Sequence, residues 1–153
     1  MKTPFLLLAA VLFLGLTRAL AHGGAELGPN GGRIVEFSKD KTLRGEVLHK
    51  DGKFTVALLD KELKPVALKD QSLTVVGGNR SNPEKPAVTK ENDRFVFPAL
   101  KGDDYEVVLR LKESPAAKPV TARFGYDAAI CSACKNPEWL CKCPSEKEPE
   151  KKQ

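Results

Sequence analysis

Residues 45–58 read GEVLHKDGKFTVAL, and this stretch decides the fold. Apolar and polar side chains alternate on both sides of Asp51-Gly52, a dipeptide typical of the two-residue type I′ turn, in which both central residues need positive φ. That turn places His49 opposite Phe54 on the neighbouring strand. Since alternate side chains of a strand share a face, we predict a β-hairpin with one apolar face, which contains Val47, His49, Phe54, Val56 and Leu58.

Short alternating runs of the same kind recur on both sides of this hairpin, and turn residues separate them about every 8 to 12 positions. No window shows a helical period, and the segment from Gly77 to Pro86 has the composition of a polar loop. We therefore expect an all-β domain over residues 33–126, an antiparallel β-sandwich of immunoglobulin-like or related type. The predicted strands are 33–38, 42–49, 53–60, 63–68, 72–77, 86–91, 93–98, 104–112 and 118–125, and the inward residues of the last two are Tyr105, Val107, Leu109, Leu111, Val120, Ala122 and Phe124.

The first 21 residues are typical of a secretory signal peptide. Lys2 supplies the positive charge, and residues 5–16 form an apolar run of 12 residues, too short to cross a bilayer comfortably. Ala19-Leu20-Ala21 then forms a small-x-small cleavage site. We expect a secreted or periplasmic mature chain that begins at His22, and residues 22–32, with five glycines, to form a flexible lead.

The charge pattern argues against nucleic acid as a partner, and the hydropathy pattern argues against a membrane. Without the signal peptide, 23 basic side chains face 20 acidic ones, a net charge of +3, and the two signs are interleaved along the chain. Nucleic-acid binding needs clustered cations, so we expect no nucleic-acid partner. No second apolar segment reaches the length of a membrane span, so we expect no membrane insertion of the mature chain.

Four cysteines follow the last predicted strand in the pattern Cys131-x-x-Cys134-x6-Cys141-x-Cys143. Four thiolates can hold Zn(II) in a tetrahedral site, and the first pair has the spacing of a zinc knuckle. An oxidising compartment also permits two disulfides. A bridge across one residue would be strained, which leaves 131–141 with 134–143, or 131–143 with 134–141.

We expect this cysteine-rich knot to cover residues 127–144, with Trp139 as its apolar plug. Residues 145–153 are almost all charged or proline and are expected to form a disordered charged tail.

The chain has two histidines, and both are candidate metal ligands. If cleavage follows Ala21, His22 would offer its α-amine and its imidazole to the same ion, an arrangement that suits Cu(II) best, with Zn(II) or Ni(II) behind it. His49 is the second candidate. Its alternative role is to pack against Phe54 at the end of the apolar face.

We expect no enzymatic activity. The sequence has no nucleophile elbow, phosphate-binding loop or His-x-x-x-His pattern, and Asp103-Asp104 is explained by a turn before a strand. A thiol–disulfide enzyme would need a helix to activate the first cysteine of Cys131-x-x-Cys134, whereas Asn136-Pro137 interrupts any helix there.

Several short motifs lie in residues 22–76: a His-Gly start, GPNGGRIVE at 28–36, VALLD at 56–60 and LKPV at 63–66. Together they resemble a small exported β-rich module associated with heavy-metal efflux adaptor proteins. Where metal-binding members often have histidine in the Gly-Pro-x-Gly-Gly stretch, this chain has Asn30. The terminal histidine and the predicted architecture are also loosely similar to periplasmic copper-binding β-sandwich proteins.

These resemblances imply an exported, non-catalytic protein that binds or buffers copper or zinc. They also imply a role accessory to metal efflux or resistance, with a metal-efflux or envelope protein as partner. The alternative is an envelope interaction module stapled by disulfides, with no metal role.

Overall fold

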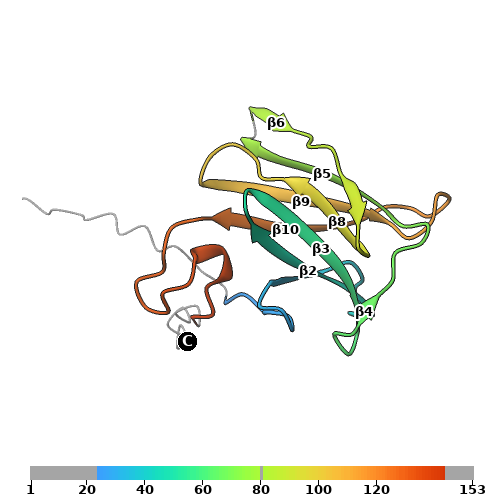
Figure 1. Cartoon of the computed structure of the whole chain (residues 1–153), viewed down its shortest axis with the longest axis horizontal. Coiled ribbons are helices and arrows are strands. Elements are labelled where there is room, and N and C mark those ends of the chain that lie inside the picture. The colour runs from blue at the N-terminus through green and yellow to red at the C-terminus, as the bar shows by residue number, and fades with distance from the viewer. Residues whose placement is uncertain (1–23, 80, 144–153) are drawn as a thin grey trace, which may run out of the picture.

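The computed structural model describes residues 24–79 and 81–143, which form two antiparallel sheets packed face to face (Figure 1). The expected all-β sandwich with a cysteine-rich C-terminal segment is thus confirmed. The described residues include no helix with the length and apolar character that a membrane span needs. The first sheet has the order β1 (Arg33–Glu36), β2 (Leu43–Lys50), β3 (Lys53–Asp60), β8 (Arg94–Pro98) and β7 (Thr89–Glu91), and β4 (Pro65–Val66) also pairs with β3. The second has the order β10 (Val120–Asp127), β9 (Asp104–Lys112), β5 (Ser72–Asn79) and β6 (Asn82–Glu84).

The β2–β3 hairpin has the predicted turn and register. Asp51 and Gly52 have φ values of 51° and 71°, as the type I′ turn requires. The pairing places Lys50 opposite Lys53, His49 opposite Phe54, Val47 opposite Val56 and Gly45 opposite Leu58.

The hydrophobic core lies between the sheets and is formed by the predicted inward faces. All the inward residues predicted for β9 are buried, as are Ala122 and Phe124 of β10, while Val120 packs against the core from its edge. Phe54 is fully buried, and its ring stacks on that of Phe97 with 5.3 Å between centroids. The Phe54 ring also packs edge-on against Phe124 and Tyr126, so the hairpin and β10 share one aromatic cluster.

Two parts of the sheet pattern differ from the sequence-based expectation. β6 lies inside the segment predicted as a polar loop, and it pairs with the end of β5 through Gly77–Asn79. Pro83 is compatible with β6 because this strand is at the sheet edge, where one side needs no ladder hydrogen bonds. β4 is only two residues long because it covers the end of β3 beyond the part that β8 pairs.

The glycine-rich lead closes on a buried carboxylate. Glu46, in β2, is fully buried on the side of the hairpin away from the sandwich interior. Its two oxygens accept hydrogen bonds from the N–H and the side-chain amide of Asn30, both at 2.7 Å, and from the N–H of Gly32 at 3.0 Å. A Cβ at Gly28 would lie 2.7 Å from the Glu46 carboxyl group, and one at Gly32 only 2.5 Å from the carbonyl oxygen of Val47. The GPNGG motif therefore fits around Glu46, whereas the sequence indicated a flexible lead.

Replacing this carboxylate with an amide is expected to destabilise the fold. In Glu46→Gln, the charge of the acceptor is lost and an NH₂ group replaces one of its two oxygens, so the hydrogen bonds that Asn30 and Gly32 donate to the carboxylate are weakened or broken. We expect the free energy of unfolding to fall by about 1.5–3 kcal/mol, measured by urea denaturation. The exposed Glu36, which pairs with Lys41 at the surface, provides the control: Glu36→Gln should change stability by less than about 0.5 kcal/mol. Equal effects of the two substitutions would contradict this role of Glu46.

Candidate metal centre

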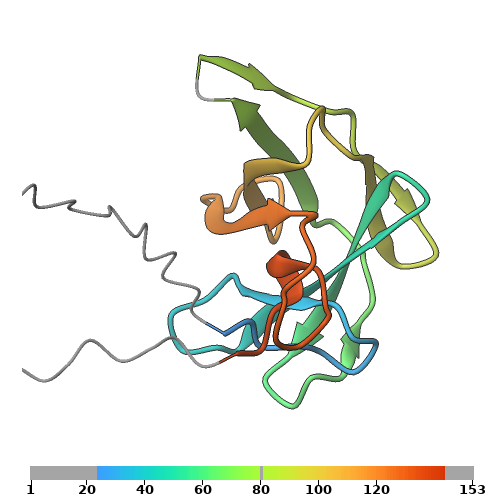
Figure 2. The ribbon, with the colours of Figure 1, turned by 90° about the vertical axis from the view of Figure 1, so that its left-hand side faces the viewer.

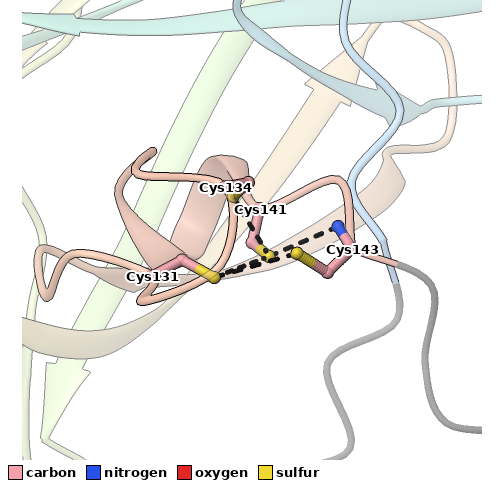
Figure 3. Close-up of side chains that lie close together, drawn as sticks. All are labelled: Cys131, Cys134, Cys141 and Cys143. Carbon is pink, nitrogen blue, oxygen red and sulfur yellow. Dashed lines mark hydrogen bonds between the residues drawn. The ribbon is translucent and has the colours of Figure 1, made fainter.

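The four cysteine sulfurs meet in one cluster after β10 (Figure 3). All four Sγ atoms lie within 4.8 Å of one another. The distances are 3.5 Å between Cys131 and Cys141, 3.7 Å between Cys134 and Cys141, and 3.8 Å between Cys131 and Cys143. Cys131 and Cys141 are buried, whereas Cys134 and Cys143 are partly accessible. The cluster could hold a metal ion.

A tight loop positions the first two cysteines. The N–H of Lys135 donates to the carbonyl oxygen of Cys131, and the N–H of Cys131 donates to that of Asn136. Lys135 has a φ of 63°, a left-handed conformation that turns the chain back directly after Cys134. As a result the N–H of Asn136 points at the Cys134 sulfur.

The second pair has a similar sulfur–amide contact at shorter spacing. The N–H of Cys143 donates to the Cys141 sulfur at 3.4 Å. Before this pair, Pro137 prevents a longer helix, and the short 3₁₀ helix η1 (Glu138–Leu140) connects the two halves of the loop. The N–H of Cys141 bonds back to the carbonyl oxygen of Glu138.

The thiols of the cluster differ in their acidity. The hydrogen bond from the Asn136 N–H lowers the pKa of Cys134 to about 7, because it stabilises the thiolate. The N–H of Cys143 also lowers the pKa of Cys141, but burial and hydrogen bonds with the neighbouring thiols raise it to about 12. Cys134 therefore carries negative charge more readily than Cys141 does.

Trp139 anchors this loop to the sandwich. Its indole is buried, with ring centroids 5.6 Å from Tyr126, 6.0 Å from Phe54 and 6.1 Å from Phe124. The sequence suggested an apolar plug inside the cysteine knot, but the side chain points into the core between the two sheets. It therefore fixes the cysteine loop (residues 131–143) to one end of the domain.

The N-terminal segment holds the loop from the other side (Figure 2, blue beside red). The N–H of Ala25 donates to the carbonyl oxygen of Cys141 at 2.7 Å, and Gly24 lies against the carbonyl oxygens of Lys142 and Cys143. The guanidinium group of Arg33, in β1, donates to the carbonyl oxygen of Trp139 at 2.7 Å. The cysteine loop is therefore held by backbone and side-chain contacts from a segment more than a hundred residues away in the sequence.

The chain matches no family model, no curated protein and no solved structure. The site is therefore interpreted from its own geometry.

The two histidines lie apart from this cluster or outside the described residues. His22 lies outside them, as do the predicted signal peptide and the charged tail. His49 does not belong to the cluster. Its ring packs against Phe54 with 4.7 Å between centroids, and its Nδ1 lies 3.3 Å from the Tyr126 hydroxyl. His49 thus packs against Phe54, as in the alternative role considered for it in the sequence analysis.

Burial lowers the pKa of His49 below its ordinary value, because the charged imidazolium is poorly solvated beside the aromatic cluster. The unfolded chain then binds a proton more readily than the folded one. The stability that neutral His49 contributes is complete above the unfolded pKa of about 6.5 and is lost as the pH falls through the folded pKa. We expect urea unfolding to show this loss on acidification, with a smaller slope in His49→Gln. An unchanged slope would mean that His49 does not contribute.

Proposed function

We propose that this protein is an exported, non-catalytic metal-binding protein whose cysteine loop holds a zinc ion. The observation that carries the proposal is the arrangement of the four sulfurs. A tetrahedral Zn(II) site with bonds of about 2.3 Å has sulfur–sulfur edges of about 3.8 Å. The contacts of 3.5, 3.7 and 3.8 Å are close to these edges, so the loop needs little movement to accept the ion.

The donor set supports zinc over Cu(II). Four sulfur ligands in a tetrahedral arrangement are typical of zinc and iron–sulfur sites, whereas Cu(II) prefers nitrogen and oxygen donors in tetragonal geometry. The N–H groups of Asn136 and Cys143 also point at ligand sulfurs, where they would stabilise negative charge on the zinc-bound thiolates. Such contacts are part of a metal site beyond its four ligands.

The proposal is tested by titrating the reduced mature protein with Co(II), a spectroscopic substitute for zinc. We expect one ion per chain, with the visible bands of a tetrahedral tetrathiolate complex, and Zn(II) should displace it stoichiometrically. Because thiols must lose protons to bind the ion, binding should weaken on acidification. A reduced chain that binds neither ion at micromolar concentration would overturn the proposal.

Copper binding at the mature N-terminus is a separate proposal, supported by the sequence alone. A free amine and an imidazole on His22 would chelate Cu(II) and give a visible d–d band. We expect one residue added before His22 to remove that band while leaving Co(II) binding by the cysteines unchanged. A band that survives the extension would contradict the His22 chelate.

The proposed location and partners also depend on the leader. Export followed by cleavage after Ala21 would place the protein where metal-efflux and envelope proteins operate. N-terminal sequencing of exported material tests this location, with His22 as the expected first residue. Exported material that keeps the leader would overturn cleavage after Ala21, and a chain found only inside the cell would overturn export; neither result would affect the cysteine site.

A further inference from the structure

We propose that oxidation converts the same cluster from a metal-binding tetrathiolate into two disulfides, Cys131–Cys143 and Cys134–Cys141, and that this conversion releases the ion. The metal-release part of this inference rests on the proposed function. Its structural basis is that each of these sulfur pairs is already in contact, at 3.8 Å and 3.7 Å. A sulfur–sulfur bond of about 2.05 Å then requires each pair to close by less than 2 Å or so.

The local chain favours this pairing over the others. Cys141 and Cys143 are separated by one residue, so a bridge between them would be strained. Cys131 and Cys141 are also in contact, at 3.5 Å. Bonding them, however, would leave Cys134 to join Cys143, a pair whose sulfurs lie within 4.8 Å of each other. In the nested pairing, Cys131–Cys143 with Cys134–Cys141, both bridges join sulfurs that already lie 3.7–3.8 Å apart.

A low-molecular-weight disulfide is a sufficient oxidant. A cluster thiolate attacks one of its sulfurs and forms a mixed disulfide, with the small thiolate as leaving group. The neighbouring cluster sulfur then attacks the mixed bond, closes the protein disulfide and releases the second small thiolate. Two oxidant molecules accept the four electrons of four thiolates, and they yield two protein disulfides, four small thiolates and the free zinc ion.

Both states keep the two halves of the loop connected. In the reduced state the ion joins Cys131 and Cys134 to Cys141 and Cys143, and in the oxidised state the two bridges make the same connection. Trp139 lies between the halves, anchored in the core. The exchange therefore changes metal content without releasing the loop, so the sandwich remains folded while the ion leaves.

The first experiment treats the reduced, zinc-loaded protein with dipyridyl disulfide and follows free zinc with a chromophoric chelator. We expect release of one zinc ion per chain together with the loss of four hydrogens in the intact mass. Trypsin, which cleaves after Lys135 and Lys142, then separates the cysteines into peptides 124–135, 136–142 and 143–147. Either pairing between Cys131 and Cys134 on one side and Cys141 and Cys143 on the other links all three peptides, whereas bridges within the two pairs leave peptide 124–135 on its own. The peptide map therefore excludes bridges within the pairs, and the double variants distinguish the two remaining pairings.

Double variants identify the bridges and separate this inference from the proposed function. Cys131→Ser/Cys143→Ser keeps the contacting sulfurs of Cys134 and Cys141, and Cys131→Ser/Cys141→Ser keeps Cys134 and Cys143. We expect the first to form its intramolecular disulfide at least about tenfold faster, because its sulfurs are already in contact.

Equal rates, or a free peptide 124–135 in the wild type, would overturn the pairing. Disulfides that form while zinc stays bound would overturn the release. A reduced chain that binds no Co(II) or Zn(II) defeats the proposed function and the release, while the pairing is still decided by rates and peptides.

Discussion

Replacing Cys141 with serine is expected to abolish tight zinc binding. Cys141 is the central sulfur of the cluster, in contact with both Cys131 and Cys134, and it accepts the N–H of Cys143. A serine hydroxyl is a poor ligand for zinc beside three thiolates. Since losing a hydrogen-bond partner of a metal ligand already costs about 10–100-fold in affinity, we expect losing this ligand to cost more than about a hundredfold. Competition with a chelator of known affinity measures the change.

The loss of zinc binding in Cys141→Ser should also remove the stabilisation of the fold by zinc. A ligand at a hundred times its dissociation constant raises the free energy of unfolding by about 2.7 kcal/mol. We therefore expect zinc to stabilise the wild-type protein and to have little effect on Cys141→Ser. Ser132→Ala is the matched control, because Ser132 lies in the same loop but is exposed, and it should retain the wild-type response. If Cys141→Ser bound zinc as tightly as Ser132→Ala, the cluster would not be the site.

The second large effect is expected for Phe54→Ala. This side chain is fully buried and contacts rings from both sheets as well as Trp139 of the cysteine loop. Removing it leaves a cavity that rigid neighbours can fill only in part. We expect a loss of about 3–5 kcal/mol in the free energy of unfolding, a large share of the total for a domain of this size. Urea denaturation in the presence of a reductant and a chelator measures this loss without a contribution from the metal.

Lys53, the exposed neighbour of Phe54 in β3, provides the control. Lys53→Ala should change stability by less than about 0.5 kcal/mol. Because Phe54 supports Trp139, we also expect Phe54→Ala to weaken zinc binding, although it removes no ligand. A variant that loses stability but binds zinc with unchanged affinity would show that the loop is held independently of this aromatic cluster.

Local patterns predicted the parts of the fold that depend on neighbouring residues. Asp51-Gly52 and the alternation around it determined the β2–β3 register because turn type and side-chain period are both local properties. Glu46 illustrates what such patterns miss. Alternation placed it on the outer face of the hairpin, and only the fold shows that the glycine turn covers that face and supplies three donors. Its signal in the sequence was the cluster of glycines, which marks close approach of the backbone as readily as flexibility.

The candidate site likewise combines features that local sequence predicts with contacts that only the fold reveals. The spacing of the cysteines identified the residues, but their grouping in space depends on Trp139 and on the N-terminal segment, both of which act over long sequence distances. The role of Trp139 was not visible because a lone tryptophan between cysteine pairs fits the inside of a small knot as well as the core of a domain. Arg33 likewise gave no signal, because its contact is with a backbone carbonyl of η1.

The hydrogen bond between Ala25 and Cys141 has a practical consequence for protein engineering. It brings both ends of the described chain to one point on the surface. Domains whose termini lie close together can be inserted into an exposed loop of a host protein with little distortion of either fold. Grafted in this way, the domain would hold the two ends of the host loop close together. The metal occupancy of the cysteine cluster would then affect how stably the inserted domain keeps them in place. With zinc as the bound ion, as proposed above, such a graft would turn an unrelated enzyme into a reporter of available zinc.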